Sequence, residues 1–92
     1  MAYSIEASPD FLRDYKKLCS KNSVFKQAVD LKIRQICEAL EFNPEHYKPL
    51  AAPLAGVRRV HVGSFVLLFD VDKTRKTIKL LVLEHHDRAY KR

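Results

Sequence analysis

The chain has 92 residues, enough for one hydrophobic core but not for two, so residues 1–92 are expected to form a single domain. Its 17 Lys and Arg against 11 Asp and Glu give a formal net charge of +6, most of it in the C-terminal third. This balance favours a polyanion or an acidic protein as partner, with a solvated basic face as the alternative. Signal-peptide features are absent, and no apolar stretch is long enough to span a bilayer, so we expect a cytoplasmic protein without membrane contact.

The N-terminal half predicts one strand and two helices. Residues 3–7 alternate apolar and polar side chains, which is typical of a short strand. Ser8, Pro9 and Asp10 predict a helix start, because they suit the cap, the first helical position and the positive end of the helix dipole. A second helix is expected from a Ser23 cap to about Glu41. Each helix has an apolar side that needs a packing partner.

The C-terminal half predicts three strands over residues 57–62, 65–71 and 77–83, each rich in β-branched, leucine and aromatic residues. Gly63-Ser64 joins the first two, and a Gly-X pair suits a type II′ turn. The result is an α+β chain in the order β-α-α-β-β-β whose last three strands form an antiparallel meander. The residues after Glu84 are expected to form a short helix or an extended tail.

No motif for nucleotide binding, serine-nucleophile hydrolysis or zinc proteolysis occurs in the chain. The candidate chemistry rests on histidines, arginines and a tyrosine near the strand ends: His61, His85, His86, Arg58, Arg59, Arg88 and Tyr90. Histidine exchanges protons near neutral pH, and arginine binds phosphate while staying charged. Together they suit RNA cleavage by the RNA's own 2′-hydroxyl. One group removes the 2′ proton, another protonates the departing 5′ oxygen, and cations stabilise the charge on phosphorus, with no metal or cofactor required. Histidines without a catalytic role are the alternative.

Three short motifs resemble the RelE/ParE superfamily of toxins, in particular the RelE and YafQ branch of mRNA interferases. They are Leu54-Ala-Gly56, Arg59-Val-His61-Val-Gly63 and His85-His-Asp-Arg-Ala-Tyr90. The resemblance implies a RelE-like fold, in which two N-terminal helices pack on one face of a twisted antiparallel sheet. It also implies a type II toxin that enters the ribosome, cuts mRNA as a metal-independent endoribonuclease and is neutralised by an acidic antitoxin in a hetero-oligomer.

The resemblance also suggests roles for individual residues. Arg59 and His61, with His85 or His86, match catalytic positions, and Tyr90 would stack on a base. The expected phosphate-binding residues are Arg58, Arg88, Lys91 and Arg92.

One departure from the family pattern is that Phe65-Val66 stands where many members have Tyr-Arg, and Ser64 is the nearest counterpart of an acidic residue in the YafQ branch. A second interpretation is therefore a binding module, either a ParE-like gyrase inhibitor or an inactive toxin that acts only in a repressor complex with its antitoxin.

Overall fold

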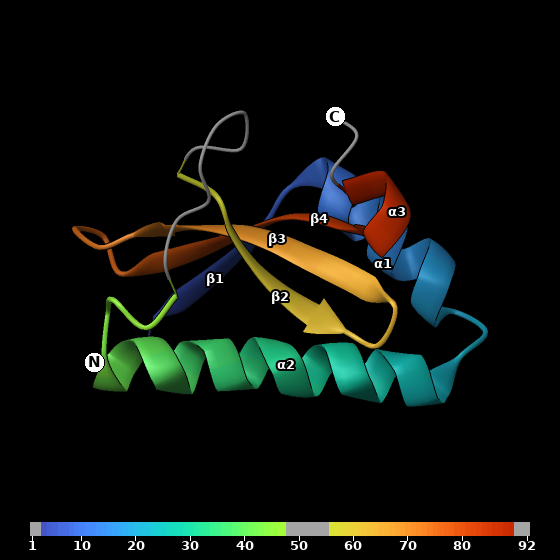
Figure 1. Cartoon of the computed structure of the whole chain (residues 1–92), viewed down its shortest axis with the longest axis horizontal. Coiled ribbons are helices and arrows are strands. Elements are labelled where there is room, and N and C mark those ends of the chain that lie inside the picture. The colour runs from blue at the N-terminus through green and yellow to red at the C-terminus, as the bar shows by residue number, and fades with distance from the viewer. Residues whose placement is uncertain (1–2, 48–55, 90–92) are drawn as a thin grey trace.

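The computed structural model describes residues 3–47 and 56–89, and its elements follow the predicted order with a short helix added at the end (Figure 1). The elements are β1 (Ser4–Ala7), α1 (Pro9–Cys19), α2 (Ser23–Phe42), β2 (Arg58–Val62), β3 (Phe65–Asp72), β4 (Thr77–His85) and α3 (His86–Ala89). Of the two alternatives for the C-terminal segment, the helix is therefore the one observed over the described residues. None of the described helices combines the length and apolar composition that a membrane span requires.

The four strands form one sheet in the order β1-β4-β3-β2. The meander β2-β3-β4 is antiparallel, as predicted. The expectation of a wholly antiparallel sheet was wrong, because β1 pairs with β4 in parallel, from Ser4 opposite Thr77 to Ala7 opposite Leu80. Strands β3 and β4, which are apolar on both sides in the sequence, occupy the two central positions.

Both helices begin with a capped N-terminus. The hydroxyl of Ser8 accepts a hydrogen bond from the Phe11 amide at 3.0 Å, and Pro9 is the first helical residue, as predicted. The cap of α2 is Asn22 rather than Ser23, since the Asn22 side chain accepts a hydrogen bond from the Phe25 amide at 2.9 Å. A carboxamide oxygen serves this purpose as well as a hydroxyl, so the helix starts one residue earlier than the predicted Ser23 cap implied.

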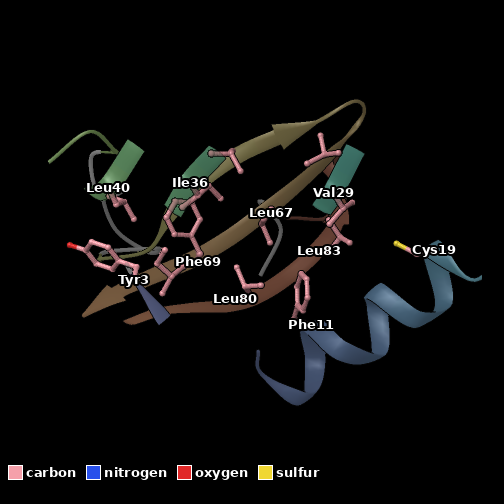
Figure 2. Packing of buried hydrophobic residues seen from close by; sticks show 13 residues of the cluster. Tyr3, Phe11, Cys19, Val29, Ile36, Leu40, Leu67, Phe69, Leu80 and Leu83 are labelled. Atoms are coloured by element: carbon pink, nitrogen blue, oxygen red, sulfur yellow. The ribbon is translucent and has the colours of Figure 1, made fainter. Parts of the chain in front are cut away.

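The two helices pack on the same face of the sheet and share one core with it (Figure 2). Phe11 and Cys19 come from α1, and Val29, Ile36 and Leu40 from α2. The largest fully buried side chains of the sheet in this core are Leu67, Phe69, Ile78 and Leu83. The predicted apolar side of α2 is thereby confirmed, whereas Leu12 of α1 is exposed. Cys19 and Cys37 are free thiols.

The opposite face of the sheet, called the far face below, has a smaller apolar cluster of its own. Val66, Leu68 and Val82 are buried there, with Val57 and Leu81 packed beside them. Strand β4 reaches this arrangement through a bulge: Phe69 lies opposite Leu80 and Leu68 opposite Val82, so that Leu81 is an extra residue. The bulge reverses which side chains of β4 point to each face after Leu81, because side chains in a strand alternate between faces.

Candidate active site on the far face of the sheet

Two predicted site residues, Arg59 and His61, project from β2 onto the far face. The strand alternates between buried and exposed residues, with Val60 and Val62 buried in the core and Arg59 and His61 exposed. Cross-strand pairing places His61 beside Val66 of β3, and Arg59 beside Leu68. The two polar side chains therefore stand at the β2 edge of the apolar cluster.

A backbone hydrogen bond brings the start of α3 to the same place. The amide of His86 donates to the carbonyl of Ser64, in the turn between β2 and β3, at 2.9 Å. In that turn Gly63 has a φ of +60°, while Ser64 is not among the described residues with positive φ. This is the pattern of the predicted type II′ turn. The tight hairpin thus holds the end of β2 close to the end of β4, and the rings of His61 and His86 lie with their centres 6.4 Å apart.

The bulge in β4 decides which of the two adjacent histidines reaches His61. After Leu81, Leu83 and His85 point to the helix side, and Glu84 points to the far face. His85 accordingly packs against Phe65, with ring centres 5.5 Å apart, and lines a pocket of about 230 Å³ beside Asp14, Lys17 and Arg88. His86 is the histidine that neighbours His61.

Asp87 stands between the two histidines of the C-terminal segment. Its Oδ1 lies 3.2 Å from Nδ1 of His86, and its backbone amide donates to Nδ1 of His85 at 3.3 Å. A carboxylate beside one ring nitrogen of a histidine favours the proton on that nitrogen, which leaves the other nitrogen to exchange a proton with a ligand. Asp87 therefore suits a positioning role for His86. The sequence shows that Asp87 directly follows the two histidines, but the contact between its carboxylate and the His86 ring is known only from the structure.

Glu84 is a member of the site that the sequence analysis missed. It lies opposite Val66, which in turn lies opposite His61, so the three residues form one row across β4, β3 and β2. Adjacent strands are about 4.8 Å apart, which puts the backbones of Glu84 and His61 at about twice that separation. The far face thus combines an arginine, two histidines and a carboxylate around the buried side chain of Val66. Across residues 3–47 and 56–89, no group of three or more His, Cys, Asp or Glu is arranged to hold a metal ion.

The chain is similar to known proteins over nearly its whole length. Residues 5–90 match the family described as the ParE toxin of type II toxin–antitoxin systems. The putative toxin RelE4 of Methanocaldococcus jannaschii is 37% identical over 98% of this chain and 93% of its own length. The fold is shared with YafQ of Escherichia coli BL21(DE3), at a TM-score of 0.71 and 21% identity over 96% of this chain and 98% of YafQ. It is shared as well with the archaeal RelE–RelB complex of Pyrococcus horikoshii OT3, at a TM-score of 0.64 and 20% identity over 96% of this chain and 99% of the matched one.

The chain belongs to the ParE toxin family within the RelE/ParE superfamily. It is thus a toxin of a type II toxin–antitoxin system, and the superfamily suggested by the sequence motifs is confirmed. Of those motifs, the segments 59–63 and 85–89 meet at the far face of the toxin, whereas Leu54 and Ala55 lie outside the described residues.

Arg58 does not fit its predicted role as a phosphate-binding residue of the toxin. Its side chain shares the buried face of β2 with Val60 and Val62 and is only 7% exposed. The guanidinium donates from Nε to the carbonyl of Tyr47 at 3.0 Å and lies 3.8 Å from Asp70. A phosphate would have to displace these internal contacts, so Arg58 is a structural residue. The sequence could have predicted this burial, because side chains alternate along a strand and Arg58 therefore points to the same face as Val60 and Val62.

The remaining predicted residues divide into two groups. Arg88 is exposed and lines the pocket next to α1 together with His85 and Glu84, whereas His61 and Val66 are not among the residues that line this pocket. Tyr90, Lys91 and Arg92 lie outside the described residues. Val66, at the position where the resemblance led us to expect an arginine, is fully buried in the apolar cluster of the far face.

Proposed function

We propose that this toxin is a metal-independent endoribonuclease that cuts mRNA on the ribosome through 2′-hydroxyl attack. The observation that carries the proposal is the pairing of His61 and His86 on an exposed face, with ring centres 6.4 Å apart and Arg59 on the same strand as His61. The attacking and leaving oxygens lie on opposite sides of the phosphorus, so the two proton-transferring groups must stand on either side of one phosphate. Two neighbouring histidine rings on one exposed face suit that requirement.

Each residue then has a specific task. Asp87 beside Nδ1 orients the His86 ring so that Nε2 faces the substrate. His61 and His86 act as the base and acid pair, and Arg59 stabilises the negative charge that develops on the phosphate oxygens. With Val66 apolar, Arg59, two residues before His61 on the same strand, is the far-face cation suited to this task, since Lys79 lies opposite Asp70, farther along the sheet.

The proposed partner outside catalysis is an acidic antitoxin that forms a hetero-oligomer with the toxin. The solved RelE–RelB complex of Pyrococcus horikoshii supports this proposal, because its toxin chain shares the fold over nearly its whole length. The net charge of +6 favours an acidic partner. An antitoxin that covers the far face would neutralise the histidine pair directly.

The test is primer extension on a translated mRNA with purified toxin and ribosomes. The wild-type chain is expected to cut at fixed positions within codons, and only when ribosomes are present. His61→Ala and His86→Ala are each expected to lower the cleavage rate by about 10²- to 10⁴-fold, the usual contribution of a general acid or base. Both residues are exposed, so the folded state should be retained.

His46→Ala is the matched control, because His46 is an exposed histidine that contacts Tyr47 near the end of α2, outside the site. It is expected to cut like the wild type. Absence of cuts from folded wild-type protein would contradict the proposal. It would favour the second candidate, a ParE-like gyrase inhibitor, which the name of the matched family and the apolar Val66 both support. Inhibition of DNA supercoiling by gyrase would then be the next measurement.

A further inference from the structure

Helix α2 has a second apolar side that no described part of the chain covers. Val24 is 75% exposed, Leu31 48% and Phe42 94%, although all three are large hydrophobic residues. They belong to a series of exposed residues along one side of the helix, here called the outer stripe: Val24, Ala28, Leu31, Gln35, Glu38 and Phe42. The core residues Val29, Ile36 and Leu40 lie on a different side of the same helix.

The outer stripe has the spacing of a helix–helix seam. Its members are separated alternately by four and three residues, which is the a/d pattern with which two helices pack side by side. When two copies of α2 run in opposite directions and cross at residue 33, residue 24 lies opposite 42, 28 opposite 38 and 31 opposite 35. Every position of the stripe then meets another position of the same stripe. This is the condition for an interface with two-fold symmetry.

A groove beside the start of α2 supplies a receptor for the most exposed residue of the stripe. The groove has a volume of about 310 Å³, and its apolar walls include Val24, Phe25 and Ala28 of α2 and Phe65 of β3. Phe42 lies 18 residues after Val24 on the same helix, so about 27 Å separate it from the groove of its own chain at 1.5 Å per residue. The antiparallel arrangement brings the Phe42 ring of each copy to the groove of the other. Aromatic side chains seated in apolar pockets are the usual anchors of protein interfaces.

The charges along α2 fit the same arrangement. The first half of this segment is net basic, with Lys21, Lys26, Lys32 and Arg34 against Asp30, which pairs with Lys26. The second half is acidic, with Glu38, Glu41 and Glu45, the last of which pairs with Lys73. This order is unfavourable within a single helix, because the helix dipole prefers acidic residues at the start and basic residues at the end. The first turn of α2 has no acidic residue, and its last turn has no basic residue. An antiparallel second copy places each basic half beside an acidic half and opposes the two helix dipoles.

We propose that the toxin self-associates through the outer stripe of α2, as an antiparallel pair in which each Phe42 occupies the groove of the other copy. A purely acidic helix is a poorer occupant, because it would be repelled by Glu38 and Glu41, which form no ion pair with any described residue. Helix α2 lies on one face of the sheet (Figure 1), whereas His61 projects from the other, so dimerisation leaves the histidine pair accessible. The interface of one helix and one groove is below the roughly 1,200 Å² that stable complexes bury, so the dimer is a weak, concentration-dependent one.

Sedimentation equilibrium of the purified full-length chain tests the proposal with two charge-reversed variants. Glu38→Lys with Glu41→Lys makes both halves of α2 basic, and Lys21→Glu with Lys32→Glu makes the basic half acidic. Each variant alone is expected to dissociate at least about tenfold more readily than the wild type. An equimolar mixture of the two is expected to form a heterodimer, because the basic and acidic helices are again complementary.

Recovery in the mixture cannot arise from misfolding, since two damaged proteins would not restore each other's association. Phe42→Ser is expected to weaken the wild-type dimer at unchanged circular dichroism. Lys16→Glu with Lys17→Glu, which reverses two exposed charges on α1, is the matched control and should leave the dissociation constant unchanged. A wild-type chain that stays monomeric at millimolar concentration, or a mixture of variants that does not associate, would overturn the proposal.

Discussion

At the scale of single residues, the neighbours Arg58 and Arg59 show how strand alternation separates two identical side chains into different roles. Arg58 is buried among core residues and donates to backbone carbonyls, whereas Arg59 is exposed on the far face. Charge alone predicts RNA contact for both arginines, whereas the alternation of side chains along β2 places them on opposite faces. Alternation alone correctly placed His61 with Arg59 on the polar side, so this part of the site could be predicted from the chain.

The two arginines are expected to respond in opposite ways to truncation. Arg58→Ala leaves the carbonyls of Tyr47 and Gly56 without their charged donor and removes a buried side chain, so the free energy of unfolding should fall by about 2–3 kcal/mol. Arg59→Ala, the matched control, should change it by less than about 0.5 kcal/mol and instead lower RNA cleavage. Urea unfolding followed by circular dichroism measures the first effect. The assignment fails if Arg59→Ala is the more destabilising of the two.

At the scale of elements, helix and strand positions followed from periodicity, but the bulge in β4 did not. The run Leu80 to Leu83 is apolar at every position, so it contains no alternation from which an extra residue could be detected. The bulge nevertheless decides that Glu84 and His86, rather than His85, approach His61. The sequence could therefore supply the histidines of the candidate site but not the choice between them.

The contact between α1 and α2 makes part of the stability pH-dependent. The Tyr15 hydroxyl donates to Asp30 at 2.6 Å, and Lys26 donates to the other carboxylate oxygen at 2.9 Å. Burial by itself would raise the pKa of Asp30, but the hydrogen bonds from Tyr15 and Lys26 outweigh it and hold the pKa below its usual 3.8. A carboxylate with a lowered pKa stabilises the fold above its unfolded pKa, and this contribution is lost as the pH falls through the lowered value.

Asp30→Asn is therefore expected to destabilise the protein at pH 7, and its effect should shrink in acid, as the pH falls through the lowered pKa of wild-type Asp30 and the carboxylate becomes protonated. Urea unfolding of both proteins at pH 7 and in acid measures the difference. Glu38→Gln, which neutralises an exposed carboxylate on the same helix, should have little effect at either pH. An Asp30→Asn effect that is equally large in acid would assign the loss to hydrogen-bond geometry rather than to charge.

At the scale of the whole molecule, the sheet order separates the two helices from the histidine pair. Helices α1 and α2 pack on one face of the sheet (Figure 1), whereas His61 projects from β2 onto the other face, where the ring of His86 from α3 neighbours it. The meander could be predicted from its turns. The parallel pairing of β1 with β4 could not, because no local turn links Ser4 to Thr77 and the pairing depends on how the helices return the chain to the sheet.

Because the candidate site lies on the far face, cations on that face and not those on α2 should determine how RNA binding depends on salt concentration. Each phosphate that a cation of the toxin neutralises releases counterions, so the logarithm of the affinity for single-stranded RNA should fall linearly with the logarithm of salt concentration. Arg59→Ala should reduce the slope by about 0.7, the contribution of one phosphate contact to single-stranded RNA. Arg34→Ala removes an equally exposed arginine from α2 and should leave the slope unchanged, because that helix covers the opposite face. Fluorescence anisotropy of a labelled RNA across a salt series measures both slopes. Equal slopes for the wild type and Arg59→Ala would place the RNA contact elsewhere than on the far face.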